Sequence, residues 1–158
     1  MSATADVAAR VAALETAEEA RNLIAAYARA VDSQDIDALG QVFGKHAVLR
    51  SRDRRHEGID EIEAFFRAEF AVNPCANRHF VSNVRVTDAT PDAASVSAYF
   101  IFVTASGGTS IVGWGSYADR MTRIDRELRI VDKFITVDHR GPADRGWAER
   151  LAAEVATR

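Results

Sequence analysis

The 158-residue sequence lacks the features that define several protein classes. Its one cysteine, Cys75, allows no disulfide within the chain, so a disulfide-stabilised fold is excluded. Lysine plus arginine number 20 and aspartate plus glutamate number 23, whereas nucleic-acid-binding domains usually carry a basic excess or stripe. No apolar run approaches the ~20 residues of a membrane-spanning helix. We therefore expect neither a nucleic-acid partner nor a membrane partner.

Motifs for cofactors are also missing. The chain contains no GxGxxG, GxxxxGK[ST] or GxSxG pattern, and its four histidines are not spaced two or four residues apart as metal ligands often are. We therefore predict no cofactor and no metal. The first ten residues show no basic segment followed by an apolar core, so we expect no secretory signal and a cytoplasmic protein.

What is present is typical of one globular domain. Hydrophobic residues make up 47% and charged residues 27% of the chain, close to globular averages. A domain of this length buries roughly 70% of the surface of its unfolded chain, enough for a core with a cavity. We predict a single domain over 1–158, with a core at about 17–138 and a helical tail at 142–157.

The first half of the sequence has the pattern of helices. Thr16 followed by two glutamates predicts a helix start, and an apolar face then continues to Asp32. Asp35 is expected to cap a short helix that Gly44 closes. Another helix is predicted from about residue 59 to 70, stopped by Asn73 and Pro74.

The second half has the pattern of strands. A short strand at 47–50 precedes four longer β segments at 79–86, 94–104, 109–124 and 129–138, separated by hairpin-length turns. This spacing predicts an antiparallel meander. Because the helices precede the run of strands, the fold class is α+β, with a curved sheet wrapped around N-terminal helices and an internal cavity between them.

Three local sequence motifs indicate a family resemblance. They are the segment 27–32 followed by 35–39, Gly58 at the start of a helix that precedes the segment 79–83, and the segment 115–121 followed by 129–133. In the order of its elements and in these motifs the chain resembles the SnoaL-like branch of the NTF2-like superfamily. That resemblance implies a cone-shaped fold and a homodimer formed through the sheet face. Among enzymes of the superfamily the chain is most similar to scytalone dehydratase and hexachlorocyclohexane dehydrochlorinase.

The resemblance assigns catalytic roles to Asp32 and His79, which match an aspartate at the end of an N-terminal helix and a histidine on the first long strand. Taken alone, these residues also fit ordinary roles at a helix end and in a half-buried strand. As a pair, a neutral imidazole removes a proton from carbon and the carboxylate orients the imidazole and balances its charge. Substrate-binding candidates around them are Tyr27, Phe43, Phe65, Asn83, Tyr99, Trp114 and Tyr117.

These candidates predict a cofactor-independent lyase, isomerase or cyclase acting on a small hydrophobic, cyclic substrate. Three alternatives remain open at this point. A non-catalytic binding protein would hold a ligand with Asp32 bonded elsewhere than to His79. A protein-interaction module would have a shallow or collapsed cavity, and a hydrolase would need a water held by several polar groups.

Overall fold

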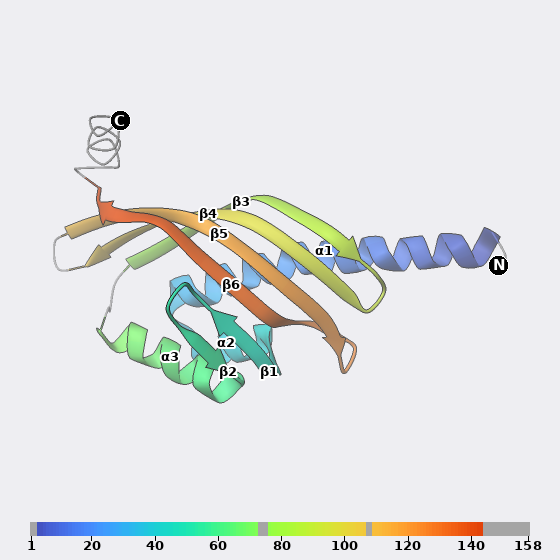
Figure 1. Ribbon diagram of the computed structural model, residues 1–158, viewed down its shortest axis with the longest axis horizontal. Coiled ribbons are helices and arrows are strands. Elements are labelled where there is room, and N and C mark those ends of the chain that lie inside the picture. Colours follow the sequence, from blue (N-terminus) through green and yellow to red (C-terminus); the bar gives the residue numbers. More distant parts are fainter. Residues whose placement is uncertain (1–2, 73–75, 107–108, 144–158) are drawn as a thin grey trace.

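The computed structural model describes residues 3–72, 76–106 and 109–143 and consists of three helices packed on one curved sheet (Figure 1). The helices are α1 (Ala3–Ser33), α2 (Ile36–Val42) and α3 (Ile59–Val72). The strands are β1 (Phe43–Arg50), β2 (Arg55–Glu57), β3 (Ala76–Ala89), β4 (Ala93–Ser106), β5 (Thr109–Ile124) and β6 (Glu127–Pro142). The predicted α+β class is confirmed.

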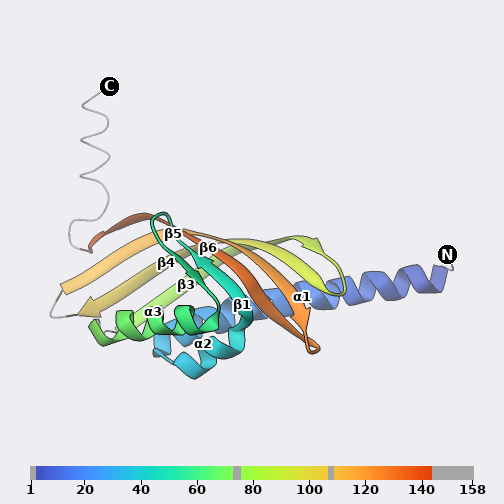
Figure 2. The ribbon, with the colours of Figure 1, turned by 60° about the horizontal axis from the view of Figure 1, so that its bottom comes forward.

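The sheet has the order β2-β1-β6-β5-β4-β3. The long strands β3 to β6 form the predicted antiparallel meander, and β1 joins it by pairing parallel to β6. All three helices lie against the same face of this open, curved sheet (Figure 2). A pocket lies between this concave face and the helices α1 and α3. The proposed helical tail at 142–157 lies outside the described residues, apart from the end of β6 and the turn at Ala143.

The helix ends agree with the sequence in part. Asp35 caps α2 as predicted, because its Oδ1 accepts a hydrogen bond from the backbone N–H of Ala38 at 2.9 Å. The predicted helix start at Thr16 is wrong, since α1 begins at Ala3 and Thr16 lies fully buried inside it. The Thr16 hydroxyl donates to the carbonyl of Pro91 rather than to its own helix. Gly44 likewise lies in β1 and does not close α2.

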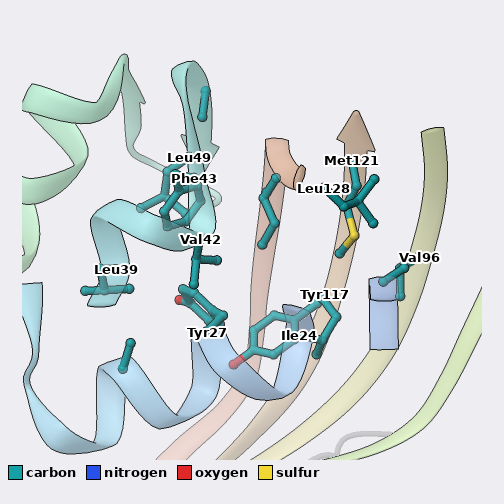
Figure 3. Packing of buried hydrophobic residues seen from close by; sticks show 14 of the residues in the cluster. Ile24, Tyr27, Leu39, Val42, Phe43, Leu49, Val96, Tyr117, Met121 and Leu128 are labelled. Carbon is teal, nitrogen blue, oxygen red and sulfur yellow. The ribbon is translucent and has the colours of Figure 1, made fainter. Parts of the chain in front are cut away.

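The hydrophobic core fills the space between α1, α2 and the sheet (Figure 3). Ile24 and Tyr27 of α1 meet Tyr117 and Met121 of β5 there, and all four side chains are at most 3% exposed. The apolar residues of α1 recur three or four positions apart, so they share one side of the helix, and this side packs against the core. The exposed N-terminal part of α1 extends past the end of the sheet at which the β3–β4 and β5–β6 turns lie (Figure 1). No helix of the described residues is long and apolar enough to cross a membrane.

Cross-strand pairing decides which side chains face the cavity. His79 of β3 pairs with Phe102 of β4, Phe102 with Gly113 of β5, and Gly113 with Arg140 of β6. Directly paired residues point to the same face of a sheet. This row therefore crosses the concave face. Gly113 is needed in it because an added Cβ would lie 2.4 Å from the ring of Phe102.

Candidate active site

Asp32 and His79 are in direct contact. The Nδ1 of His79 lies 2.6 Å from Oδ1 of Asp32, and the backbone N–H of His79 donates to Oδ2 of the same carboxylate at 2.9 Å. Both carboxylate oxygens are thus bonded to one residue of β3. The two side chains are 14% and 15% exposed, so the pair is largely shielded from bulk water. The prediction placed these two residues together, and the geometry brings them within hydrogen-bond distance.

The end of α1 holds Asp32 in this position. The chain leaves the helix through Gln34, whose φ of 56° is in the left-handed region. The N–H of Gln34 donates to the carbonyl of Val31 at 3.2 Å and the N–H of Asp35 donates to that of Ala30 at 3.0 Å. These two bonds form a Schellman motif, which ends a helix in a defined geometry. Asp32 therefore sits on the last turn of a capped helix, facing β3.

The contact fixes the protonation pattern of the imidazole. A carboxylate accepts hydrogen bonds only, so Nδ1 of His79 carries the proton it shares with Asp32. In the neutral ring Nε2 is then the nitrogen with a free lone pair. The Asp32–His79 pair is thus arranged as a base with an orienting carboxylate, a geometry used for proton transfer.

His79 of this pair lines an apolar pocket of about 300 Å³ between α1, α3 and the concave face of the sheet. Aromatic rings from five elements, α1, α3, β3, β4 and β5, line it. The centroids of Phe100 and Phe102 lie 6.1 and 5.8 Å from that of His79, and Phe100 stacks on Tyr117 at 4.3 Å. Polar groups of the lining are Gln34, Glu69, Asn77, Thr104 and Arg140. A cavity with aromatic walls and a few polar groups is typical of small-molecule sites.

Comparison with known proteins agrees with this architecture. The family model of the SnoaL-like domain matches residues 12–133. The chain belongs to the SnoaL-like family. Among curated protein sequences none matches the chain.

Solved structures of similar fold include several proteins with enzyme names. A candidate aromatic ring hydroxylase from Novosphingobium aromaticivorans is 27% identical, with a TM-score of 0.75 over 82% of this chain and 94% of the other. A candidate scytalone dehydratase from the same species is 12% identical, with a TM-score of 0.76 over 84% and 90% of the two chains. A hexachlorocyclohexane dehydrochlorinase of Novosphingobium barchaimii is 13% identical, with a TM-score of 0.75 over 84% and 93%.

Two tyrosines of this SnoaL-like pocket surround a buried ion pair. Lys133 of β6 donates from Nζ to Oδ2 of Asp119 of β5 at 2.9 Å, and both side chains are fully buried. The Nζ also lies 4.0 and 3.8 Å from the ring centroids of Tyr27 and Tyr117. Burial and the Asp119 carboxylate raise the pKa of Tyr27, and burial raises the pKa of Tyr117. Both phenols therefore stay protonated and keep their donor hydrogens.

The structure places three of the seven predicted substrate-binding residues in the pocket. These are Tyr27, Phe65 and Tyr117. Phe43 is not among the lining residues, because it is packed in the core with its ring 5.9 Å from that of Tyr27.

The other three residues are directed away from the cavity. Tyr99 is 60% exposed on the convex face, since its neighbours Ala98 and Phe100 point inward. Trp114 pairs with Ile101 on that convex face and stacks on His139, so the glycines on either side of it, rather than the indole, face the pocket. Asn83 lies at a β-bulge with φ 52° and is exposed. The bulge interrupts the alternation that would have placed Asn83 on the face of His79.

Sequence reasoning missed several lining residues. Phe66, Phe70, Phe100, Phe102, Thr104 and Arg140 all border the pocket. For β4 the signal was available, because alternation along the strand puts Phe100, Phe102 and Thr104 on one face. The residues 3–72, 76–106 and 109–143 contain no group of three or more histidine, cysteine or acidic side chains that could hold a metal ion.

Proposed function

We propose that this protein is a cofactor-independent acid/base enzyme that removes a proton from carbon in a small, hydrophobic, cyclic substrate. The observation that carries the proposal is the 2.6 Å contact between His79 Nδ1 and Asp32 Oδ1 beside an apolar pocket. A base that accepts a proton from carbon works best where water is excluded and its orientation is fixed. The last turn of α1 fixes the orientation of the pair, and the packing around it leaves the two side chains only 14% and 15% exposed.

The proposed step begins at Nε2 of His79, which takes the proton while Asp32 stabilises the resulting imidazolium. In an elimination, the C–H electron pair forms a double bond and the group on the adjacent carbon leaves with its bonding pair. The same first step leads to isomerisation if the proton returns to another carbon, or to ring closure if the carbanion attacks a carbonyl. Donors that can stabilise the charge that develops include the neutral phenols of Tyr27 and Tyr117.

The similar structures support elimination as the first choice among these outcomes. The candidate scytalone dehydratase and the dehydrochlorinase both share the fold of this chain, and both names denote removal of a small molecule across a carbon–carbon bond. The rival binding protein would have Asp32 bonded away from His79, and an interaction module would have a collapsed cavity. The contact and the pocket of about 300 Å³ weigh against both alternatives.

The experiment is a turnover and exchange assay with a matched pair of variants. Cyclic β-hydroxy ketones are incubated with the protein in D₂O, and dehydration and deuterium uptake at the α-carbon are followed by NMR. Asp32→Asn is expected to lower the rate at least about 100-fold, because the amide neither holds the tautomer in which Nε2 of His79 is the base nor balances the imidazolium charge, and a positioned general base contributes that much or more. Asp35→Asn, three residues away, is the control, since asparagine caps a helix as well as aspartate does. If wild type binds members of the panel but neither dehydrates nor exchanges any of them, the protein is a binding module.

We also propose that the convex face of the sheet binds a second copy of this chain. Phe80, Tyr99, Ile101 and Val103, on the neighbouring strands β3 and β4, are 40–60% exposed. Contiguous exposed apolar surface of this kind usually marks an interaction site, and a two-fold axis lets one such patch cover its own copy.

Sedimentation equilibrium tests the dimer. Wild type is expected at twice the 17.3 kDa of one chain. Ile101→Asp is expected to give monomers, and Val7→Asp, at an exposed position near the start of α1, is expected to leave the mass unchanged. A monomeric wild type at micromolar concentration would contradict the proposal.

A further inference from the structure

Arg140 of β6 brings a positive charge to the lining of the pocket. The lining also includes the carboxylate of Glu69, which Arg54 binds at 3.0 Å, so the charge of Glu69 is already balanced. The guanidinium of Arg140 makes no ion pair or hydrogen bond within residues 3–72, 76–106 and 109–143. Its side chain is exposed, so a ligand that enters the pocket can reach it.

Arg140 stands at the opposite end of a cross-strand row from the proposed base. The row runs from His79 through Phe102 and Gly113 to Arg140, all on the concave face. Neighbouring strands lie about 4.8 Å apart, so the backbones of His79 and Arg140 are about 14 Å apart along the sheet. This separation suits contacts with two ends of one ring system better than two contacts at the same carbon.

An apolar surface joins the two ends of the row. The ring of Phe102 lies over Gly113, since a Cβ added to this glycine would come within 2.4 Å of the ring. The same ring has its centroid 5.8 Å from that of His79. Neither Phe102 nor Gly113 has a polar side-chain atom. A ligand that lies along the row therefore meets a flat hydrocarbon surface along its length and a guanidinium at its end.

We propose that Arg140 binds a carboxylate of the substrate, and that the substrate is a small cyclic carboxylic acid whose apolar ring system lies along Phe102. A planar carboxylate accepts two parallel hydrogen bonds from the fork of one guanidinium. A phosphate dianion would need more positive charge than one arginine supplies, and it would lie in the same pocket as Glu69. The position of the reacting carbon at His79 rests on the proposed function, but recognition of the carboxylate requires no turnover.

Two probes of similar shape test the carboxylate site. Naphthalene-2-carboxylate and naphthalene-2-carboxamide are both flat and differ in charge, and their affinities for the full chain are measured by fluorescence titration at pH 7. Wild type is expected to bind the carboxylate more tightly, with a preference that falls at high salt because salt screens exposed charges. Arg140→Gln is expected to weaken carboxylate binding at least about 10-fold, the effect of a lost hydrogen bond to a charged group, and amide binding less than about twofold.

Two further variants serve as controls. Arg29→Gln removes the same charge from an exposed position of α1 that does not line the pocket, so it should leave both affinities unchanged. Arg140→Lys keeps the charge and should keep the preference, with weaker carboxylate binding because an ammonium lacks the fork. Equal losses of carboxylate binding in Arg140→Gln and Arg29→Gln, or a wild type that does not prefer the carboxylate, would overturn the carboxylate site.

The outcomes separate this inference from the proposed function. Asp32→Asn should keep the preference for the carboxylate even though it loses turnover. A wild type that has this preference, loses it on Arg140→Gln and turns over no substrate supports the carboxylate site and refutes the enzyme. A wild type that dehydrates β-hydroxy ketones but binds both probes equally supports the enzyme and overturns the carboxylate site.

Discussion

Removing one partner of the buried ion pair should destabilise the protein strongly. Lys133 and Asp119 are 2.9 Å apart and fully buried. Burial is the main cause that lowers the pKa of Lys133 and raises the pKa of Asp119, and in each case it outweighs the attraction of the partner. Burying the two charges therefore costs more free energy than burying neutral groups would. Each charge is nevertheless stabilised by its partner, so removing one of them leaves the other unpaired.

The magnitude follows from what each variant leaves behind. Lys133→Met leaves a buried carboxylate without its cation, and Asp119→Leu leaves a buried ammonium held only by the rings of Tyr27 and Tyr117. We expect each to lower the free energy of unfolding by about 3–5 kcal/mol, the usual cost of breaking a buried pair. For a chain of this size that corresponds to a Tm lower by roughly 6–20 °C. The lysine variant should lose more, because in the aspartate variant the faces of two rings still stabilise the cation.

The double variant gives the opposite expectation. With Lys133→Met and Asp119→Leu combined, no charge is buried, and the thioether still packs between the tyrosines. Replacing a buried pair by apolar groups is often neutral or stabilising, so we expect stability within about 1 kcal/mol of wild type, or above it. The coupling energy of the cycle should then be at least about 5 kcal/mol.

The assay is urea unfolding at pH 7, followed by circular dichroism, for wild type, both single variants and the double variant. Single variants that each cost less than about 1 kcal/mol, or a double variant as unstable as the sum of the two, would refute the reasoning.

The pH dependence of stability adds a second check, with the double variant as the reference. Because the pKa of Asp119 is raised above 3.8, the folded protein binds this proton more tightly than the unfolded chain. The free energy of unfolding of wild type, compared with that of the double variant, should therefore rise as the pH falls through the raised pKa of Asp119 towards 3.8.

Three further changes have defined outcomes. Gly113→Ala places a Cβ 2.4 Å from the ring of Phe102, so we expect a loss of about 1–3 kcal/mol in urea unfolding and slower turnover, because that ring lies beside His79, the proposed base. Asp35→Ala removes the cap of α2 and should cost about 1 kcal/mol with turnover retained. Arg126→Gly should raise Tm, since Asp125 and Arg126 form the β5–β6 hairpin with positive φ values of 49° and 71°, which glycine adopts without strain.

The elements of this fold were predictable because each depends on local patterns. The helical face that ends at Asp32, the cap at Asp35 and the alternating segments of the meander all involve neighbours in sequence. The pair of Asp32 with His79, 47 residues apart, came from the family resemblance, and the geometry places the two in contact. The start of α1 was missed because Thr16 has a cap-forming side chain, and its tertiary role shows only in its contacts with Pro91 of the β3–β4 turn and Arg123 of β5.

Which residues face the cavity could not be read from alternation, because β-bulges change it. In β3 the bulge at Asn83 moves the inward positions from His79 and Val81 to Val84 and Val86. In β6, Ile130 pairs with Met121 while Asp132 pairs with Arg120, so an extra residue separates Ile130 from the next inward position, Lys133.

Simple alternation from Ile130 would have put Asp132 and Phe134 inside and Lys133 in solvent. A bulge bends and twists the strand that contains it, and a long sheet needs such bends to wrap around helices. The curvature that creates the pocket is thus produced by the same extra residues that reverse the inward and outward positions. This explains why the sequence-based prediction named the Asp32–His79 pair but wrongly assigned Asn83 to the pocket and overlooked Lys133. In cone-shaped folds of this kind, the pairing register has to be known before the lining of the cavity can be assigned.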